Sequence, residues 1–419
     1  MFRNTGFALP GFDMAEYKKS LAEFLKEYEI RSTPFENPNY KGHMLWDICR
    51  AHFDAYVKTL KYNQNIVAVE AAPFACELET KFIEEFASDI GYPEEAWGYL
   101  SSGGTVSNIY GLWVARNKQQ AKGKKAEYVL VGDDYHYSIQ KACNLLGLRV
   151  KPLRKDTDVP PDEIAAVICI CGCTEFGACD DILYWREFCD KHDIHLHVDA
   201  AYGGYYVFCK DSEYLTEGAR VMLNNIHLAD SITIDVHKTG YAPFALGVCL
   251  IKNREDVLYI NSEKDVKYLG VTTTSLYTLE GSRPGSMAAA AYFGHKCLKP
   301  HYKEILEMNL IGAKRLREKI LGSKYFTLYE ASDMAQVCFT SKVLPMRRLM
   351  DTFCIIGNVR NDRIELITTN LHGVDYFRIC VMDPTFKDTI DAWWEKLEST
   401  VAEVEKNYMS EMTSAVQSE

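Results

Sequence analysis

Four short segments carry residue types that together could bind an anion and a flat heterocycle and bond to a carbonyl carbon. Each follows a β-rich run and leads into a helix or loop, and open α/β sheets bind ligands at the carboxyl ends of their strands. In chain order the segments are SSGGT ending at Thr105, GDDYHY around His136, HVDAAY around Asp199 and IDVHKTG around Lys238.

The first segment places Gly103 and Gly104 directly before Thr105 and a clear helical run. Glycines let the backbone approach a phosphate closely, and the free N–H groups and dipole at a helix start favour an anion. A glycine-rich helix entry is also common as a simple turn. The segment therefore indicates a phosphate site only in combination with the others.

The second and third segments offer an imidazole and a carboxylate at strand ends. His136 could stack on a planar heterocycle, or it could be a surface histidine that caps a helix. Asp199 ends an apolar run, where a sheltered carboxylate can keep a ring nitrogen protonated because the ion pair favours both charges.

The fourth segment places Lys238 between two β-rich runs, with Asp235 and His237 beside it. A lysine in a largely apolar setting can lose its proton and bond to a carbonyl carbon, whereas most lysines are solvated surface groups. A phosphate turn, a stacking histidine, a strand-end carboxylate and a lysine are the parts that a pyridoxal 5′-phosphate site requires.

Several motifs resemble those of the group II pyridoxal-dependent amino-acid decarboxylases of fold type I, most strongly the bacterial tyrosine decarboxylases. The similarity runs from about Asn63 to Ala290, and it is carried by ELET, GTVSN with WVARN, HVDAAYGGY, ADSITIDVHKTGYAP and LEGSRPG, with weaker likeness in YFRICVMDP. The resemblance implies that an L-amino acid, aromatic like tyrosine, is converted to its amine and carbon dioxide.

The resemblance also assigns roles to single residues. Lys238 would hold the cofactor aldehyde, Asp199 would pair with the pyridine nitrogen, and His136 would stack on the ring. The remaining cofactor-binding positions would be Gly104, Thr105 and His237 at the phosphate and Thr174 near the ring hydroxyl.

A loop tyrosine acts beside the substrate in enzymes of this family. Tyr268 is the candidate here, because it lies in the polar segment DVKYLGVTTTSLY, and Tyr277 at the end of that segment is the alternative. The resemblance implies that this hydroxyl, or His136, returns a proton to the substrate after carbon dioxide leaves.

The elements that must position these residues alternate between β-rich and helical patterns, which favours a mainly parallel sheet covered by helices. The β-rich runs are EYVLVGDD, RVKPL, AAVICICGC, IHLHVDAAY, SITIDVHK and FALGVCLIK. The resemblance implies fold type I, an α/β architecture with a seven-stranded sheet. We expect an N-terminal helical segment (1–62), a large cofactor-binding domain (63–295) and a small C-terminal α+β domain (296–419).

The C-terminal domain is expected to contain a small antiparallel sheet and a long helix. QVCFTSK, RIELITTN and YFRICVM are its predicted strands, and the helix runs through DAWWEKLESTVAEVEKNY. A helix through SMAAAAYFGHKCL leads out of the large sheet. Near the N-terminus, the spacing of apolar residues predicts an amphipathic helix from about Asp13 to Glu29, which needs a surface to cover and favours a homodimer.

Other functions remain open at this point. His195, His197 and Asp199 share one strand face and could bind zinc or iron, and the three cysteines of ICICGC could contribute to a zinc site. The motifs DVHKTGYAP and GSRPG also resemble those of sphingosine-phosphate lyases, which break a carbon–carbon bond. A decarboxylation-linked oxidative deaminase and a catalytically silent binding protein are further alternatives.

Composition excludes some partners. The net charge is −11 and the basic residues are dispersed, so a nucleic-acid surface is not expected. No apolar run reaches the roughly 18 residues that cross a bilayer, and no signal core is visible at the start. We therefore expect a cytoplasmic protein without a membrane partner, whose 14 cysteines are mostly reduced core residues.

Overall fold

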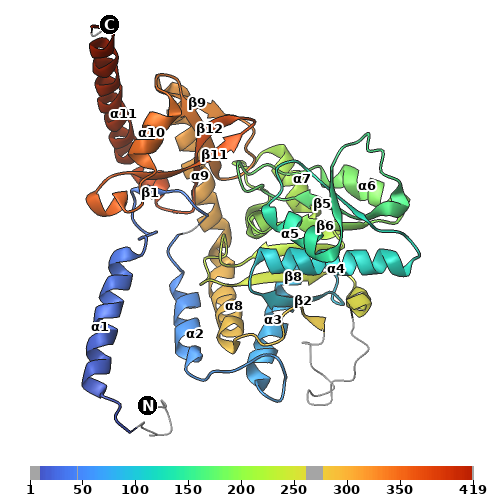
Figure 1. Ribbon diagram of the computed structural model, residues 1–419. Helices are drawn as coiled ribbons and strands as arrows, with labels where there is room; N and C mark the ends of the chain where they lie inside the picture. The colour runs from blue at the N-terminus through green and yellow to red at the C-terminus, as the bar shows by residue number, and fades with distance from the viewer. Residues whose placement is uncertain (1–9, 45, 261–276, 418–419) are drawn as a thin grey trace.

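The computed structural model describes residues 10–44, 46–260 and 277–417, and a seven-stranded sheet dominates it (Figure 1). In spatial order its strands are β2 (Trp97–Ser101), β8 (Gly247–Ile251), β7 (Ser231–Asp235), β6 (His195–Asp199), β5 (Ile164–Ile170), β3 (Tyr128–Val131) and β4 (Arg149–Pro152). Strand β8 runs antiparallel to its neighbours β2 and β7, and the other adjacent pairs are parallel. The predicted α/β fold with a mainly parallel sheet is confirmed.

The sequence indicates six of these strands and misses β2. This strand is a short edge strand between α3 (Pro73–Ile90) and α4 (Gly104–Ala121), and it enters the sheet only through its antiparallel pairing with β8. That pairing joins segments about 150 residues apart, so local periodicity carries little sign of it.

Helices cover both faces of the large sheet. Successive strand residues enter different cores: Val167 packs in one cluster, while Ile168 belongs to the cluster formed with α4 and α5 (Tyr137–Leu146). This alternation explains why the strands read as continuous apolar runs, since both faces of a parallel sheet are buried. The remaining helices of this region are α2 (Arg50–Leu60), α6 (Ile182–His192), α7 (Glu217–Asn225) and α8 (Gly285–Leu298).

A second, five-stranded sheet contains the predicted C-terminal strands. Its spatial order is β1 (Tyr40–Lys41), β11 (Glu365–Leu371), β12 (Val374–Cys380), β10 (Gln336–Ser341) and β9 (Phe326–Tyr329). All pairs are antiparallel except β1 with β11, so a short N-terminal strand completes a sheet of C-terminal residues. The helices of this region are α9 (Tyr302–Gly322), α10 (Met346–Phe353) and α11 (Phe386–Gln417).

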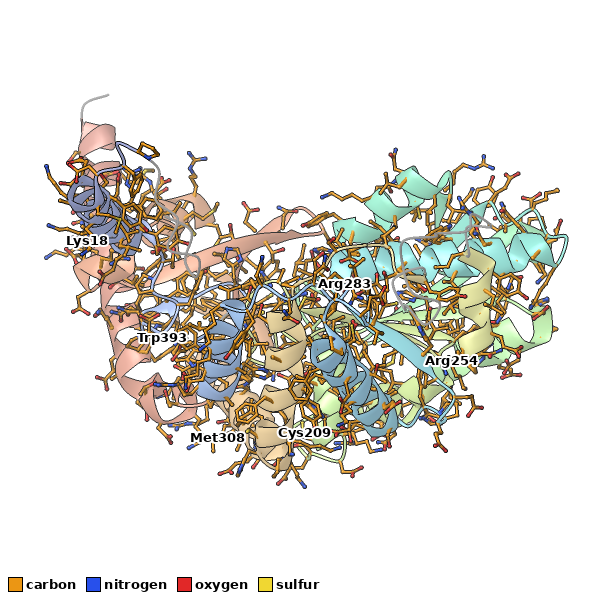
Figure 2. All side chains as sticks on the ribbon, turned by 90° about the horizontal axis from the view of Figure 1, so that it is seen from below. Lys18, Cys209, Arg254, Arg283, Met308 and Trp393 are labelled. Atoms are coloured by element: carbon orange, nitrogen blue, oxygen red, sulfur yellow. The ribbon has the colours of Figure 1, made fainter. Side chains whose placement is uncertain are left out.

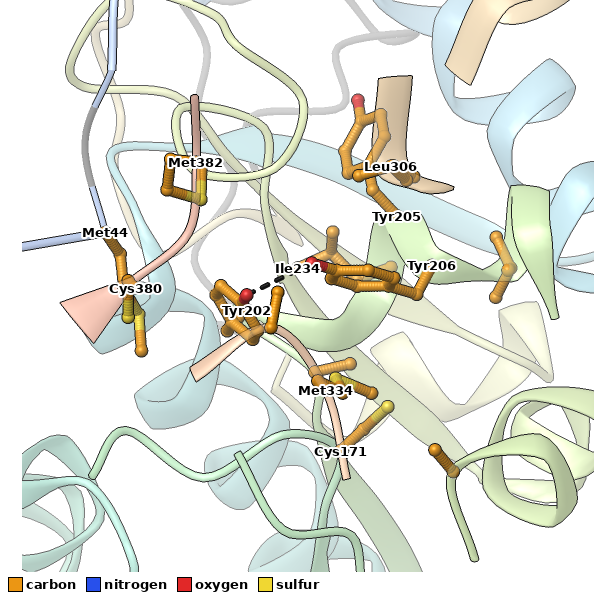
Figure 3. Close-up of a cluster of buried hydrophobic side chains, with 14 of the residues drawn as sticks. Met44, Cys171, Tyr202, Tyr205, Tyr206, Ile234, Leu306, Met334, Cys380 and Met382 are labelled. Carbon is orange, nitrogen blue, oxygen red and sulfur yellow. Dashed lines mark hydrogen bonds between the residues drawn. The ribbon is translucent and has the colours of Figure 1, made fainter. Parts of the chain in front are cut away.

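A continuous apolar core joins the two sheets. Figure 3 shows Tyr202, which follows β6, between Tyr206 and Cys380, the last residue of β12, and all three belong to one cluster of buried side chains. The hydroxyls of Tyr202 and Tyr206 lie 3.1 Å apart, which gives each buried phenol a partner. The core thus crosses residue 295, and the division into segments 1–62, 63–295 and 296–419 stays a prediction.

The predicted N-terminal helix is confirmed as α1 (Met14–Arg31), and Asp13 caps it by accepting hydrogen bonds from the N–H groups of Ala15 and Glu16. None of the 18 residues of α1, all described, is buried. The helix stands apart from the large sheet in Figure 1, and Lys18 lies at the edge of the molecule in Figure 2. Among the described residues, no helix has the length and apolar character that would span a membrane.

Packing of α2 on α8 yields the first prediction. A Cβ atom at Gly294 of α8 would lie 1.9 Å from Nδ1 of His52, and this buried ring nitrogen is bound to the Ala290 carbonyl oxygen. We expect Gly294→Ala to lower the free energy of unfolding by about 1–3 kcal/mol, because overpacking must displace the ring. Gly322→Ala is the control, since a Cβ there meets no atom within 4 Å. Equal denaturant midpoints for both variants would contradict the prediction.

Candidate active site

The turn between β2 and α4 is shaped by two glycines. Gly103 has φ +133°, a conformation that L side chains rarely adopt, and a Cβ there would lie 3.2 Å from Cε1 of His237. At Gly104 a Cβ would lie 3.0 Å from Oδ2 of Asp235 and 3.2 Å from the Cβ of Ala201. The glycines therefore let His237 and Asp235 approach the start of α4 closely, and the first N–H groups of a helix favour an anion there.

A buried ion pair fixes the strand that leads into this turn. Glu79 on α3 pairs with Arg283, and both side chains are less than 10% exposed. The Leu100 N–H donates to Oε1 of Glu79 at 2.9 Å, and Nη1 of Arg283 donates to the Leu100 carbonyl oxygen at 2.9 Å. Further along, the Glu280 carboxylate accepts from the N–H and hydroxyl of Ser102, at 2.8 and 3.0 Å. The ELET and LEGSRPG motifs thus hold the turn in place.

Lys238 follows the end of β7 by three residues, and Asp235 closes that strand. The Lys238 Nζ lies 3.0 Å from Oδ2 of Asp235, and its side chain is 20% exposed. His237 has its Nε2 3.6 Å from the same oxygen, and burial lowers the pKa of this imidazole below its ordinary value. Asp235 therefore orients the lysine amine beside the glycine turn that precedes α4.

Asp199 and His136 come from the ends of two other segments of the sheet region. Asp199 is the last residue of β6, and its carboxylate accepts from the Ala201 N–H at 3.1 Å and from Nδ2 of Asn108 at 2.9 Å. His136 caps α5, where its Nδ1 accepts from the Ser138 N–H. Burial lowers the pKa of His136, and the nearby Asp199 carboxylate offsets only part of this shift, so the imidazole is neutral near pH 7.

These side chains line one cavity of about 400 Å³ at the carboxyl end of the large sheet. Six residues predicted from the sequence contribute to it: Gly104, Thr105, His136, Asp199, His237 and Lys238. An amine, two carboxylates, two imidazoles and a helix start therefore converge on a space large enough for a small cofactor and substrate.

The family of the chain is shown by a match to a conserved domain. Residues 54–342 match the pyridoxal-dependent decarboxylase conserved domain. The chain belongs to this family. It is a carboxy-lyase that uses pyridoxal phosphate, so the resemblance, the enzyme class and the cofactor predicted from the sequence are confirmed.

Sequence alignments with similar proteins cover most of this chain. A probable L-tyrosine/L-aspartate decarboxylase of Methanococcus maripaludis (strain S2 / LL) is 28% identical over 401 residues, which are 90% of this chain and 97% of that protein. The L-tyrosine decarboxylase of Levilactobacillus brevis is 26% identical over 416 residues, covering 74% of this chain and 66% of that protein.

Solved structures share the fold of the decarboxylase at low sequence identity. Oryza sativa TDC, solved with PLP and tryptamine, has a TM-score of 0.80 at 17% identity and covers 96% of this chain and 90% of its own. The Burkholderia pseudomallei sphingosine-1-phosphate lyase has a TM-score of 0.75 at 18% identity and covers 98% and 96%. At 17% and 18% identity, this likeness establishes the fold alone.

The cavity fits the cofactor of the family. Gly103, Gly104 and Thr105 at the start of α4 line the cavity beside His237 and Lys238, so the first N–H groups of this helix are placed to meet a phosphate. The lysine amine and the Asp199 carboxylate are the donor set that an aldehyde and a ring nitrogen require. The residues present therefore suit pyridoxal phosphate.

Three predicted residues need separate comment. Thr174 lies in the turn after β5 and is not among the described residues that line the cavity, so its contact with the cofactor stays a prediction. Tyr268 lies outside the described residues. Tyr277 packs against the cluster of Trp97, Tyr99 and Tyr110, and its carbonyl oxygen accepts from the Tyr110 hydroxyl at 2.5 Å.

The two histidines that suggested a metal site are engaged in hydrogen bonds inside the protein. His195, His197 and Asp199 do share one face of β6, but both imidazoles are hydrogen bonded to the Ser231 hydroxyl at 2.7 Å. Burial lowers the pKa of His195 to about 4 and that of His197 to about 3. Among the residues that the structure describes, no group of three or more His, Cys, Asp or Glu side chains is placed to hold a metal ion.

Sequence reasoning missed three positions that support the cavity. Asn108 lies four residues after Gly104, and this spacing alone would have placed it on the same side of the helix. Glu79 and Arg283 stand in motifs that the sequence had singled out, but their pairing joins positions 204 residues apart and leaves no local signal.

Proposed function

We propose that this cavity decarboxylates an aromatic L-amino acid such as tyrosine, with Lys238 as the cofactor lysine. The observation that carries the proposal is the convergence of Lys238, Asp199 and His136 with the start of α4 around one space of about 400 Å³. Their order and chemistry correspond to the needs of one cofactor with an aldehyde, a basic ring nitrogen and a phosphate.

Each residue has a task that its position supports. The α4 N–H groups at Gly104 and Thr105, with His237, bind the phosphate, and the Lys238 amine holds the cofactor covalently. Asp199 keeps a proton on the ring nitrogen, and neutral His136 covers the ring face. When bound, pyridoxal phosphate supplies the electron sink for the charge left as carbon dioxide departs.

Return of a proton to the substrate's α-carbon is assigned to Tyr268. The alternative, Tyr277, is not among the described residues that line the cavity, and its ring packs in a cluster formed by β2 and α4. Neutral His136 is the other group able to take part, because it lines the cavity itself.

The cavity wall supports an aromatic substrate over an acidic one. Tyr137 and Phe244 line the space and are 59% and 56% exposed, so their rings are available to pack against an aromatic side chain. Among the described lining residues, Lys238 is the only lysine or arginine. A second carboxylate, as in aspartate, would find no further cationic partner among them. Relatives carry the names L-tyrosine and L-tyrosine/L-aspartate decarboxylase.

A substrate panel tests this proposal. With tyrosine, phenylalanine, tryptophan, aspartate, glutamate and histidine, we expect carbon dioxide and amine in equal amounts and the highest kcat/KM with tyrosine. Turnover of aspartate, glutamate or histidine without turnover of any aromatic amino acid would refute the substrate assignment. Aldehyde with ammonia instead of amine would favour the oxidative deaminase, and no product from any amino acid together with cleavage of a phosphorylated amino alcohol would favour the lyase.

The assembly is proposed to be a homodimer, because α1 exposes an apolar stripe that needs a partner. Tyr17, Leu21, Phe24 and Tyr28 recur at spacings of four, three and four, and each is at least 39% exposed. A second copy of the chain would bury this stripe in a symmetric interface.

Sedimentation of the holoenzyme tests the dimer. We expect Leu21→Glu combined with Phe24→Glu to shift the protein toward monomer, because charges in an apolar interface are costly. The control pair, Lys19→Glu with Lys26→Glu, changes charge on the other side of α1 and should leave the dimer intact. A fully active monomeric wild type would contradict the proposal.

A further inference from the structure

The side chain of Asn108 connects the two groups proposed to face the cofactor ring. Its Nδ2 donates to Oδ2 of Asp199 at 2.9 Å and to the hydroxyl oxygen of Ser138 at 3.0 Å. Its Oδ1 lies 3.0 Å from Nε2 of His197. Asn108 is 1% exposed, so all three contacts are sheltered from water, where hydrogen bonds are strong and costly to lose.

The contacts continue on both sides of this amide. On one side, Nδ1 of His197 lies 2.7 Å from the Ser231 hydroxyl, which lies 2.7 Å from Nε2 of His195. On the other side, the Ser138 hydroxyl lies 2.9 Å from Nδ1 of His136. The result is one series of hydrogen bonds that runs from His195, the first residue of β6, to both residues proposed to face the cofactor.

Near the Asp199 carboxylate, the donor and acceptor of each hydrogen bond in this series can be assigned in only one consistent way. An ionised Asp199 can only accept, so Asn108 must turn its NH₂ group toward it and its oxygen toward His197. The Nε2 of His197 must then carry a hydrogen, which the Thr233 hydroxyl oxygen at 3.3 Å can share. Burial keeps His197 neutral with one ring proton, so its Nδ1 accepts from the Ser231 hydroxyl.

The donors and acceptors between Asn108, Ser138 and His136 follow in the same way. The Ser138 oxygen accepts from Asn108, so its own hydrogen is free to be donated to Nδ1 of His136. The Ser138 N–H also points to this nitrogen at 3.3 Å. His136 therefore carries its single ring proton on Nε2.

We propose that Asn108 is a positioning residue that orients the Asp199 carboxylate and sets the tautomer of His136 together, and that His197 holds its amide in the required orientation. The inference rests on the proposed function, in which Asp199 and His136 face the cofactor ring. If the amide turned over, its oxygen would face Oδ2 of Asp199 across 2.9 Å, and the two acceptors would repel each other.

Pyridoxal phosphate itself is the probe for this proposal. We expect Asn108→Ala to raise its dissociation constant by about 10- to 100-fold, because a hydrogen bond to a charged group is lost in a buried site. We also expect the pH midpoint of the visible absorption change of the bound cofactor to rise. A ring nitrogen held less firmly in its protonated form withdraws less charge from the carbon–nitrogen bond to Lys238, which then keeps its proton to higher pH.

Asn117→Ala is the matched control, because Asn117 lies on the same helix and bonds to the Tyr259 carbonyl oxygen away from the cavity. It should leave the dissociation constant and the midpoint unchanged. The melting temperature of each cofactor-free variant separates loss of folding from loss of binding.

His197 is tested by two substitutions that differ in donor capacity. His197→Gln keeps an N–H group able to reach the Asn108 oxygen, whereas His197→Leu removes it. We expect the leucine variant to reproduce the midpoint shift of Asn108→Ala and the glutamine variant to stay close to wild type. Equal midpoints for the two variants would overturn the role given to His197.

An Asp199→Asn variant separates failure of the inference from failure of the proposed function. If Asp199→Asn weakens cofactor binding and shifts the midpoint but Asn108→Ala matches Asn117→Ala, the role of Asn108 is wrong while the site stands. If Asp199→Asn also binds the cofactor like wild type, the assignment of Asp199 itself is wrong. Shifts in the same direction for Asn108→Ala and Asp199→Asn support the inference.

Discussion

Replacing Lys238 by alanine is expected to abolish covalent attachment of pyridoxal phosphate and to lower kcat by about 10³-fold or more. The amine is the one lysine nitrogen among the described residues that line the cavity, and Asp235 orients it at 3.0 Å. Its loss removes both the covalent hold on the cofactor and a group able to exchange protons with substrate. Borohydride reduction followed by peptide mass analysis should find the cofactor on Lys238 in the wild type and on no lysine in the variant.

Lys151→Ala provides the matched control, because Lys151 is an exposed lysine of β4 on the same sheet. It should retain the label and the activity. A reduced adduct on another lysine of the wild type, or unchanged turnover in Lys238→Ala, would show that the DVHKTG motif does not carry the cofactor.

Several of the predicted cofactor residues line one cavity, and a shared position relative to the strands made it possible to predict them from the sequence. Lys238, Asp199 and His136 each follow a β-rich run, and the carboxyl ends of strands in an open α/β sheet meet at one edge. Local pattern was sufficient because the sheet topology brings such positions together. The mainly parallel sheet followed from the same alternation of strands and helices, whereas its seventh strand was implied only by the resemblance to fold type I.

Residues that act through pairing across the chain could not be found in this way. The four-residue spacing from Gly104 places Asn108 on the same side of α4, but its role appears only once its partners on β6 and α5 are known. The strand β2 and the two-residue strand β1 depend on partners far away in the sequence, and no local period marks them. Tertiary contacts decide which hydrogen-bond partners a buried polar group finds, and the sequence alone does not give these contacts.

The pair formed by Glu79 and Arg283 is the strongest example of such a contact. Both residues are buried, and both are bound to the backbone of Leu100. Leu100 is followed directly by Ser101 and the glycine turn proposed to bind the phosphate. A change in this pair should therefore affect folding and cofactor binding together.

Glu79→Ala is expected to lower the free energy of unfolding by about 3–5 kcal/mol, because it leaves the Arg283 guanidinium charged and buried without its partner. Denaturant unfolding measures this loss, and the dissociation constant of pyridoxal phosphate should rise in the same variant because the Leu100 N–H loses its acceptor beside the turn. Glu77→Ala is the control from the same motif: Glu77 forms an exposed ion pair with Lys81, which contributes little to stability.

A double variant distinguishes an unpaired charge from a simple loss of packing. Glu79→Leu combined with Arg283→Met removes both charges and keeps apolar volume, so it should be more stable than Glu79→Ala. If the double variant is as unstable as the single one, the penalty does not come from the stranded guanidinium. If Glu79→Ala unfolds like wild type, the ion pair does not hold β2. The double variant could also recover stability while cofactor binding stays weakened. This result would show that the two hydrogen bonds to Leu100 serve the site as well as the fold, because an apolar pair cannot replace hydrogen bonds to the Leu100 backbone.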